Sequence, residues 1–363
     1  MPKLSGNKGE WSEIYTFIRL LQIGKLYAAD ADLNKIDGVF YNIINILRNE
    51  TIGELEFRIN KESNRIDVTK TSDNTILISV EISDLKLIAD KLFKDIVSAD
   101  TATFSVDYAE EFLNKVSVDT LKAKSSDKAD IRMKIHDINS GFESVQGFSI
   151  KSRLGSPSTL INAGKTTNFL YEIEGNITDE IAEKFNTCSK KFKDRFNYLS
   201  SENCGLKFVK ADHSIFESNL LLLDGSMPEL CALMLVEYYS NGVNTVAESL
   251  NNLSEKNPLN FNLVNGQPFY EYKFKKLLTE CALGMLPSKP WNGKADATGG
   301  YIIVREDGEV LCYHLFNRNE FEDYLINNTK FETASTSRHQ FGDIYKENGK
   351  YYIKLNLQIR FTK

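Results

Sequence analysis

Residues 129–154 read ADIRMKIHDINSGFESVQGFSIKSRL and contain two short apolar runs that also carry charged and hydroxyl side chains. Side chains alternate between the two faces of a strand, so each run sorts into an apolar and a polar set. The apolar set is Ile131, Met133, Ile135, Phe148, Ile150 and Leu154, and the polar set includes Asp130, Arg132, Lys134, His136, Ser149, Lys151 and Arg153. The stretch therefore predicts an antiparallel hairpin with one buried face, turning at residues 139–145.

The polar face of this hairpin brings an acid and a base together. Asp130 is expected to lie roughly across from Ser149 and Lys151, whereas Asp137 belongs to the other face and sits near the turn. Phosphodiester hydrolysis needs an Asp and a Lys in this relation, because carboxylates hold Mg²⁺ and a lysine orients the attacking water. Asp130 is thus a candidate metal ligand. An ordinary cross-strand ion pair would use the same two residue types.

The arrangement resembles the active site of the PD-(D/E)XK nucleases, with Ser149 at the position of the usual second acid. A further carboxylate must then come from another segment, and the candidates are Glu10, Glu13, Glu143, Glu172 and Glu174. In that superfamily a helix before the catalytic sheet often supplies such a glutamate. Glu13 is the preferred ligand, because it lies beside the apolar stripe of a helix expected at residues 9–23.

Periodicity along the chain predicts an α/β fold. Helical spacing occurs at 9–23, 84–96, 107–116 and 179–197 and within 215–253 and 268–286. Strands are expected within 53–82, at 167–175, at 351–361 and in a hairpin that turns at Asp307-Gly308. We expect a restriction-endonuclease-like core with a mixed sheet flanked by helices in residues 1–200, with an inserted segment at about 28–100. Residues 201–363 are expected to form an α+β lobe that recognises DNA.

The composition narrows the class of protein. The chain has 363 residues and a formal net charge of −6, so attraction to a polyanion would have to come from a local basic surface. Its five cysteines form no CxxC pair, which argues against a zinc site or a disulfide framework. No stretch approaches the roughly 18 apolar residues of a membrane helix. A cytoplasmic protein with no membrane association is expected.

Several longer stretches resemble the HpaII family of Type II restriction endonucleases. They are GNKGEWSEIYTFIRLL, GKLYAADADLNKI, GFSIKSRLGSPSTLINAGKTTNFLYEI, ALGMLP, GGYIIVREDGEVLCYHLFNRNEFEDYL, TKFETASTSRHQFG and KLNLQIRF, and they span Gly6 to Phe361. The resemblance implies Mg²⁺-dependent cleavage of double-stranded DNA at a short palindrome, with 5′-phosphate and 3′-hydroxyl ends. It also implies Asp130 and Lys151 as the catalytic pair, with Ser149 as this family's variant of the acid. The family's type member is associated with CCGG.

The resemblance also implies partners. A DNA methyltransferase of the same specificity would protect the host DNA, and a homodimer is the simplest assembly that places two active sites on two strands. A monomer that nicks twice is the alternative.

Candidate DNA contacts lie in polar loops. Asn317, Arg318, Arg338 and His339 are candidates for contacts to base edges, because Arg is the commonest specific reader of guanine. Arg153, Lys165 and Asn168, in the segment that follows the hairpin, are candidates for clamping phosphate. Lys122, Lys124 and Lys128 precede Asp130 and are candidates for following the DNA backbone. Solvated loops and connectors have similar compositions.

Two other functions remain open on the sequence. Ser149 in place of an acid is compatible with a DNA-binding protein that has lost catalysis, and the discriminating feature is whether a glutamate completes the site beside Asp130. An RNA or structure-specific nuclease would be indicated by surface aromatic residues that stack on unpaired bases.

Overall fold

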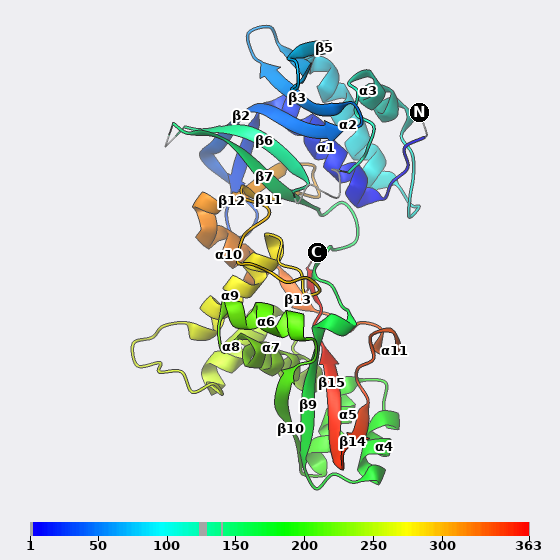
Figure 1. Cartoon of the computed structure of the whole chain (residues 1–363), viewed down its shortest axis with the longest axis vertical. Helices are drawn as coiled ribbons and strands as arrows, with labels where there is room; N and C mark the ends of the chain where they lie inside the picture. Colours follow the sequence, from blue (N-terminus) through cyan, green and yellow to red (C-terminus); the bar gives the residue numbers. More distant parts are fainter. Residues whose placement is uncertain (1–2, 123–128, 139–140, 363) are drawn as a thin grey trace. The chain divides into compact units, whose positions relative to one another are not determined.

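The computed structural model describes residues 3–122, 129–138 and 141–362. They form two compact units (Figure 1). The first unit comprises Met1–Ser158 and Ala295–Tyr324, and the second comprises Thr159–Lys294 and Leu325–Thr362. The chain therefore leaves the first unit, builds most of the second, returns, and ends in the second.

A nine-stranded mixed sheet forms the framework of the first unit. In spatial order its strands are β1 (Lys25–Ala29), β12 (Val310–His314), β11 (Gly300–Val304), β7 (Glu143–Ser152), β6 (Ile131–Asp137), β2 (Lys35–Glu50), β3 (Gly53–Asn60), β4 (Arg65–Lys70) and β5 (Thr75–Glu81). β7 pairs with β11 in parallel and β1 with β12 in parallel, and the other pairs are antiparallel. β1 also pairs with β2, which closes a ring of strands from which β3, β4 and β5 extend.

Helix α1 (Lys8–Ile23) begins and ends at clear sequence signals. The Asn7 side chain accepts a hydrogen bond from the Glu10 N–H (3.0 Å), and the Glu10 carboxylate accepts one from the Asn7 N–H (2.7 Å). This reciprocal pair is a capping box. Gly24, with φ of 65°, ends the helix in the left-handed conformation that glycine adopts without strain.

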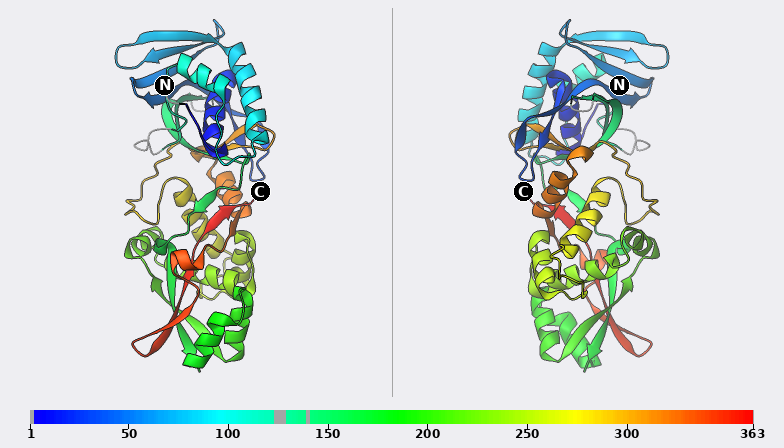
Figure 2. Two further views of the ribbon diagram at one scale, coloured as in Figure 1. Left: turned by 90° about the vertical axis from the view of Figure 1, so that its right-hand side faces the viewer. Right: turned by 90° about the vertical axis from the view of Figure 1, so that its left-hand side faces the viewer.

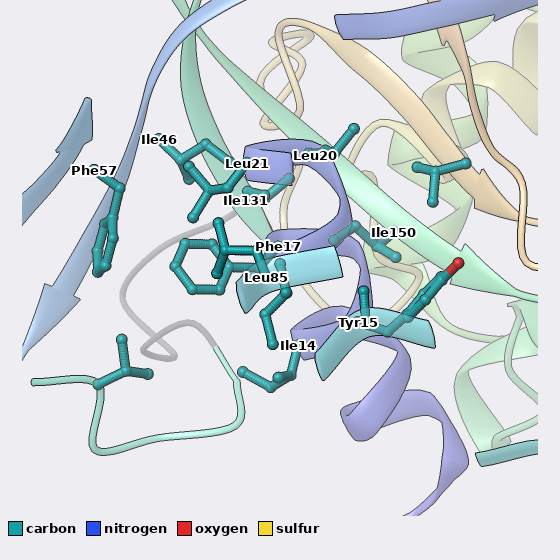
Figure 3. Packing of buried hydrophobic residues seen from close by; sticks show 14 of the residues in the cluster. Ile14, Tyr15, Phe17, Leu20, Leu21, Ile46, Phe57, Leu85, Ile131 and Ile150 are labelled. Atoms are coloured by element: carbon teal, nitrogen blue, oxygen red, sulfur yellow. The ribbon is translucent and has the colours of Figure 1, made fainter. Parts of the chain in front are cut away.

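The hydrophobic core of the first unit lies between the sheet and its helices. Ile131 and Ile150 of the hairpin pack with Phe17 and Leu21 of α1 and with Leu85 of α2 (Ile82–Ser98), as Figure 3 shows. Figure 2 shows α1 and α2 side by side, and α3 (Asp107–Lys115) contributes to the same core. The buried face expected for residues 129–154 is therefore confirmed.

The second unit combines two small antiparallel sheets with helices. One sheet has the order β10 (Cys204–Ala211), β9 (Asn168–Gly175), β15 (Lys350–Asn356) and β14 (Ile344–Glu347), and the other has β13 (Thr329–Phe331), β16 (Ile359–Phe361) and β8 (Thr159–Ile161). The helices are α4 (Asp179–Thr187), α5 (Phe192–Ser201), α6 (Ser214–Leu223), α7 (Met227–Val236), α8 (Val246–Lys256), α9 (Phe269–Ala282) and α11 (Thr336–His339). Helix α10 (Arg318–Asn327) begins in the first unit.

The units do not divide where the sequence suggested. The boundary expected near residue 200 falls inside the second unit, because the sheet of the first unit is completed only by β11 and β12. Residues 28–100 are also not set apart, since β2 lies directly beside β6 in the main sheet. Local sequence patterns do not mark these boundaries, because the strands that complete one sheet are far apart in sequence.

Two expected elements are each split in two. The helix expected at 179–197 is α4 followed by α5, and Arg195 of α5 turns back to donate to the Phe185 carbonyl of α4 (2.8 Å). The apolar stripes of the two short helices then face each other, as in the Phe185–Phe196 ring contact. The strand expected at 351–361 is β15 and β16, which belong to different sheets.

Among the described residues, no single helix is both long enough and apolar enough to cross a membrane. Ser214–Leu223 and Met227–Asn241 meet that standard only when joined, and the pair is bent by 109°.

Candidate active site

The β6–β7 hairpin has the predicted parity. Ile131 pairs with Phe148, and the N–H of Asp130 donates to the Phe148 carbonyl (3.0 Å), which brings Asp130 level with Ser149. Burial alternates strictly along β6. Asp137 is on the buried face, as the alternation predicted, so it does not share a face with Asp130.

One oxygen of the Asp130 carboxylate is held by β7. Oδ2 accepts hydrogen bonds from the Ile150 N–H (2.7 Å) and from the Ser149 hydroxyl (3.0 Å). Hydrogen bonds to an ionised group are stronger than those between neutral groups, so these two donors fix the carboxylate. Oδ1 has no hydrogen-bond partner among residues 3–122, 129–138 and 141–362. It is the oxygen that remains for a ligand.

The Glu13 side chain extends from α1 toward the Asp130 carboxylate. Burial raises the pKa of its carboxyl to about 8, and the negative charge of Asp130 adds to the rise, while Lys122, Lys151 and Arg48 act in the opposite direction. Glu13 and Lys151 also line the same surface groove, and the charge of Asp130 acts on the Glu13 carboxyl. The structure therefore brings Glu13, Asp130 and Lys151 together, as preferred from the sequence.

An open groove of about 890 Å³ lies beside these residues. It is lined by Asn7, Lys8, Gly9, Glu13, Ala99, Asp100, Thr101, Ala102, Ile150, Lys151, Ser152, Leu154, Gly155, Ser156 and Ser158. Serine, threonine, asparagine and lysine side chains supply most of its polar groups. These are the donors that proteins use for the sugar–phosphate backbone of nucleic acids.

Tyr301 of β11 is a buried neighbour of the candidate site. It pairs with Ser149 in parallel register, and its buried ring lies 5.9 Å from the Lys151 ammonium. Burial raises the pKa of the Tyr301 hydroxyl far above its usual value, and the negative charge of Asp130 contributes. No local sequence pattern points to this tyrosine, because its proximity depends on a parallel pairing between strands about 150 residues apart.

Other glutamates considered from the sequence have separate roles. Glu10 closes the α1 capping box and pairs with Lys122 (2.8 Å). Glu143, at the start of β7, is exposed and pairs with Lys134 (2.7 Å). Neither needs a metal ion to balance its charge.

Glu172 and Glu174 belong to β9 of the second unit. They pair there with Lys350 (2.8 Å) and Lys207 (3.1 Å). Glu13 thus remains the carboxylate that the structure associates with Asp130.

The residues fit a hard divalent cation that is shared with substrate. Among the described residues, no group of three or more His, Cys, Asp and Glu side chains is placed to hold a metal by itself. Mg²⁺ usually keeps several waters and takes one or two carboxylates together with substrate phosphates, so Asp130 and Glu13 suffice. The donor set contains oxygen only, which suits Mg²⁺ rather than a soft metal.

The candidate phosphate clamp is only partly exposed. Lys165 is exposed, but Arg153 contacts Tyr324 and pairs at 3.9 Å with Glu306. Asn168 is buried, with its amide donating to the His339 carbonyl (2.9 Å) and its oxygen accepting from Asn356 (2.7 Å). The side chain of Asn168 is therefore used in hydrogen bonds within the second unit. It is no longer a candidate for contact with DNA.

The candidate base readers lie in different surroundings. Arg338 is exposed in the short helix α11, whose N-terminus is capped by the Ser335 hydroxyl, and His339 is half-buried beside it. Asn317 is half-buried just before α10, and the neighbouring Arg318 pairs with Glu322 (2.6 Å). Arg338 is the exposed arginine of this set that makes no ion pair within the part of the chain that the structure describes.

The lysines before Asp130 are described only in part. Lys122 is engaged with Glu10. Lys124 and Lys128 lie outside the described residues.

Comparison with known proteins identifies close similarity over almost the whole chain. The family model described as HpaII restriction endonuclease matches residues 7–361. The Type II restriction enzyme HpaII of Haemophilus parainfluenzae is 44% identical over 358 residues, which cover 98% of this chain and 98% of that protein. No solved structure matches the chain.

Proposed function

Because this chain belongs to the HpaII restriction endonuclease family and is a restriction endonuclease, we propose that it cleaves both strands of duplex DNA at a short palindrome. CCGG is the first sequence to test. The proposed fold of the catalytic part is a PD-(D/E)XK core, made of α1 and the mixed sheet around β6 and β7. A catalytically inactive DNA-binding protein is no longer a competing interpretation.

The grouping of Asp130, Glu13 and Lys151 beside the groove is the observation that supports this chemistry. Asp130 and Glu13 would hold Mg²⁺ together with phosphate oxygens of the DNA. When bound, Mg²⁺ lowers the pKa of a bound water and offsets the charge that builds up on the phosphate. In this role the two carboxylates need to be ionised when the cation is bound. Burial and Asp130 raise the pKa of Glu13 to about 8, and the charges of Lys122, Lys151 and Arg48, like that of the cation, favour its ionised form.

Ser149 and Lys151 have different proposed roles. The Ser149 hydroxyl and the Ile150 N–H fix Oδ2 of Asp130, which leaves Oδ1 for the cation. Ser149 is thereby a positioning residue and not a substitute ligand. Lys151 donates a hydrogen bond to the attacking water and stabilises negative charge on the phosphate. Water attacks phosphorus in line, the bond to the 3′ oxygen breaks, and the products carry a 5′-phosphate and a 3′-hydroxyl.

The proposed DNA contacts fall into two classes. Phosphates follow the groove past Lys8 and Ser156, and Lys165 adds an exposed cation in the second unit. Arg338, His339 and Asn317 are the proposed base readers. Arg153 and Arg318 have protein partners, so they would have to exchange those partners to bind DNA.

The proposed assembly is a homodimer in the cytoplasm, because one active site for each strand matches the two-fold symmetry of a palindrome. Its genetic partner is a DNA methyltransferase that modifies the same sequence and so protects the host.

The experiment that tests the proposal is digestion of a sequenced plasmid with Mg²⁺ or with EDTA, followed by sequencing of the fragment ends. The expected result is a set of discrete fragments that requires Mg²⁺ and that shares one palindrome at its ends. The Asp130→Ala variant should bind that sequence without cutting, whereas Asp137→Asn, on the other face of the hairpin, should still cut. Cleavage by Asp130→Ala would show that the active site lies elsewhere.

A further inference from the structure

Arg48 lies at the end of β2, beside the start of β6. Leu47 pairs with Arg132, so the following residue of β2 is level with the first residues of the catalytic hairpin. Arg48 and Asp130 line the same small cavity of about 10 Å³. Past a bulge in β2, Arg48 shares a face with the buried Ile46, which belongs to the core that packs against α1.

The guanidinium of Arg48 is buried and held in place. Its Nε lies 2.7 Å from a carboxylate oxygen of Glu50, and its Nη2 donates to the Thr120 carbonyl (2.8 Å). The side chains of Arg48 and Glu50 are only 8% and 1% exposed. A buried charge is costly unless it is paired and hydrogen-bonded, so these contacts keep Arg48 in one orientation.

The guanidinium also faces the part of α1 that carries Glu13. Its central carbon is 5.2 Å from the centre of the Phe17 ring. Glu13 and Phe17 are four residues apart on one helix, and residues at that spacing are neighbours on the helix surface. Arg48 therefore lies on the side of α1 that carries Glu13, near enough for its charge to act on the Glu13 carboxyl, and it borders the same cavity as Asp130. Its Nη1 makes no hydrogen bond or ion pair to any of the described residues.

We propose that Arg48 is a positioning residue of the nuclease site, whose guanidinium orients the Glu13 carboxylate beside Asp130 so that both can hold one divalent cation. The inference rests on the proposed roles of Glu13 and Asp130. Residues that orient metal ligands typically change metal affinity or activity by about 10- to 100-fold when they are replaced. Arg48 itself would touch neither the phosphate nor the attacking water.

The test compares Arg48→Gln with Arg58→Gln. Arg58 is a matched control, because it pairs with Glu56 two residues away on the neighbouring strand β3 but is 59% exposed. Binding of Mn²⁺ to the DNA-free protein is measured by electron paramagnetic resonance of the free ion, and the cleavage rate is measured over a range of Mg²⁺ concentrations. Arg48→Gln should weaken Mn²⁺ binding and raise the Mg²⁺ concentration for half-maximal rate by roughly ten-fold or more. The DNA affinity of Arg48→Gln in EDTA should be unchanged. The Arg58→Gln enzyme should keep the Mn²⁺ binding and the Mg²⁺ dependence of the unaltered protein.

Loss of folding is controlled by a second variant. Arg48→Gln removes the cation that lies 2.7 Å from the buried Glu50 carboxylate, so the double variant Arg48→Gln/Glu50→Gln removes both charges together. Circular dichroism shows which of the two variants folds. The folded variant is expected to show weaker Mn²⁺ binding and a higher Mg²⁺ requirement for cleavage. Unchanged Mn²⁺ and Mg²⁺ dependence in a folded variant would overturn the role of Arg48. If Asp130→Ala still cleaved DNA, the proposed function itself would fail, whatever the result for Arg48.

Discussion

The two oxygens of Asp130 have different surroundings, and in the proposed active site this difference accounts for a serine where an acid is usual. Oδ2 is occupied by Ser149 and Ile150, so the strand orients the carboxylate instead of adding a second one. The alternation of residues 129–154 predicted the faces of Asp130, Ser149 and Lys151, because parity needs only the local sequence. It did not predict the direction of each hydrogen bond, which depends on how the side chain of Asp130 bends over β7.

Replacing Ser149 should weaken catalysis without abolishing it. Ser149→Ala removes one of two donors to Oδ2, and a hydrogen bond to a charged group contributes about 1.5 to 3 kcal/mol. We therefore expect the single-turnover cleavage rate to fall by roughly 10- to 100-fold. Ser144→Ala is the control, since Ser144 lies on the same strand and bonds to Gln146 instead. A rate equal to that of the unaltered enzyme would mean that Ile150 alone holds Asp130.

His314 should make the first unit sensitive to acid. Burial lowers the pKa of this histidine to about 4, with Asp137 opposing the shift, and its Nδ1 accepts from the Phe316 N–H (3.1 Å). An unfolded histidine has a pKa near 6.5, so between those values the unfolded state binds more protons. The contribution to stability is therefore complete above about pH 6.5 and falls as the pH drops toward 4.

The variant His314→Asn tests this dependence. Asparagine can still accept from the N–H two residues ahead but does not titrate. Urea unfolding from pH 7 to pH 4 should show a smaller loss of stability than in the unaltered protein, by up to roughly 3 kcal/mol at the acid end. An acid loss in His314→Asn equal to that of the unaltered protein would contradict the assignment.

At the level of elements, the hairpin, α1 and the Asp307-Gly308 hairpin were predicted because each carries a regular local pattern. β2 was not predicted, although it lies beside β6 and supplies Arg48. Its register shifts between Ile43 and Asn45, so the alternation of apolar and polar residues is interrupted in the middle of the strand. Glu13 was preferred because a helix before the sheet often supplies a glutamate in the PD-(D/E)XK superfamily and because it lies beside the apolar stripe of α1. No local pattern shows which helix meets the hairpin.

Gly147 allows β7 to lie close to the residue before Asp130. A Cβ atom at Gly147 would be 2.7 Å from the Ala129 Cβ, which is closer than real Cβ atoms approach each other. Gly147→Ala should displace Ala129 and with it Asp130, and overpacking of this kind typically costs about 1 to 3 kcal/mol. We expect lower thermal stability and a cleavage rate reduced at least about ten-fold, since small displacements of catalytic groups are costly.

A compensating change separates this local clash from a general defect. In Gly147→Ala/Ala129→Gly the added methyl group occupies the space of the one removed, and cleavage should recover. Gly205→Ala, on strand β10, is the control, because a Cβ atom added at Gly205 would meet no other atom within 4 Å among the described residues. Failure of the double variant to recover would place the cause of the defect outside the contact with Ala129.

For the whole molecule, the chain order interleaves the unit with the proposed active site and the unit with the proposed base readers. Parallel strands need a long crossover connection, and between β7 and β11 that connection is residues 159–294 of the second unit. The sheet with the proposed active site is therefore interrupted in sequence by the unit that carries the proposed DNA contacts Arg338, His339 and Lys165. The sequence could not reveal this arrangement, because β7 and β11 pair although they are far apart in the chain.

This arrangement predicts that base reading and phosphate binding can be separated within the second unit. Arg338→Ala should reduce discrimination between the recognised palindrome and a site with one base pair changed, by about 1 to 3 kcal/mol if it reads a guanine. Lys165→Ala should weaken binding to both sites equally, because a phosphate contact carries no sequence information. Titrations of both variants against both DNA duplexes at one salt concentration supply the comparison. If Arg338→Ala weakened both sites alike, Arg338 would be a phosphate contact, and the base readers would have to be sought among Asn317 and His339.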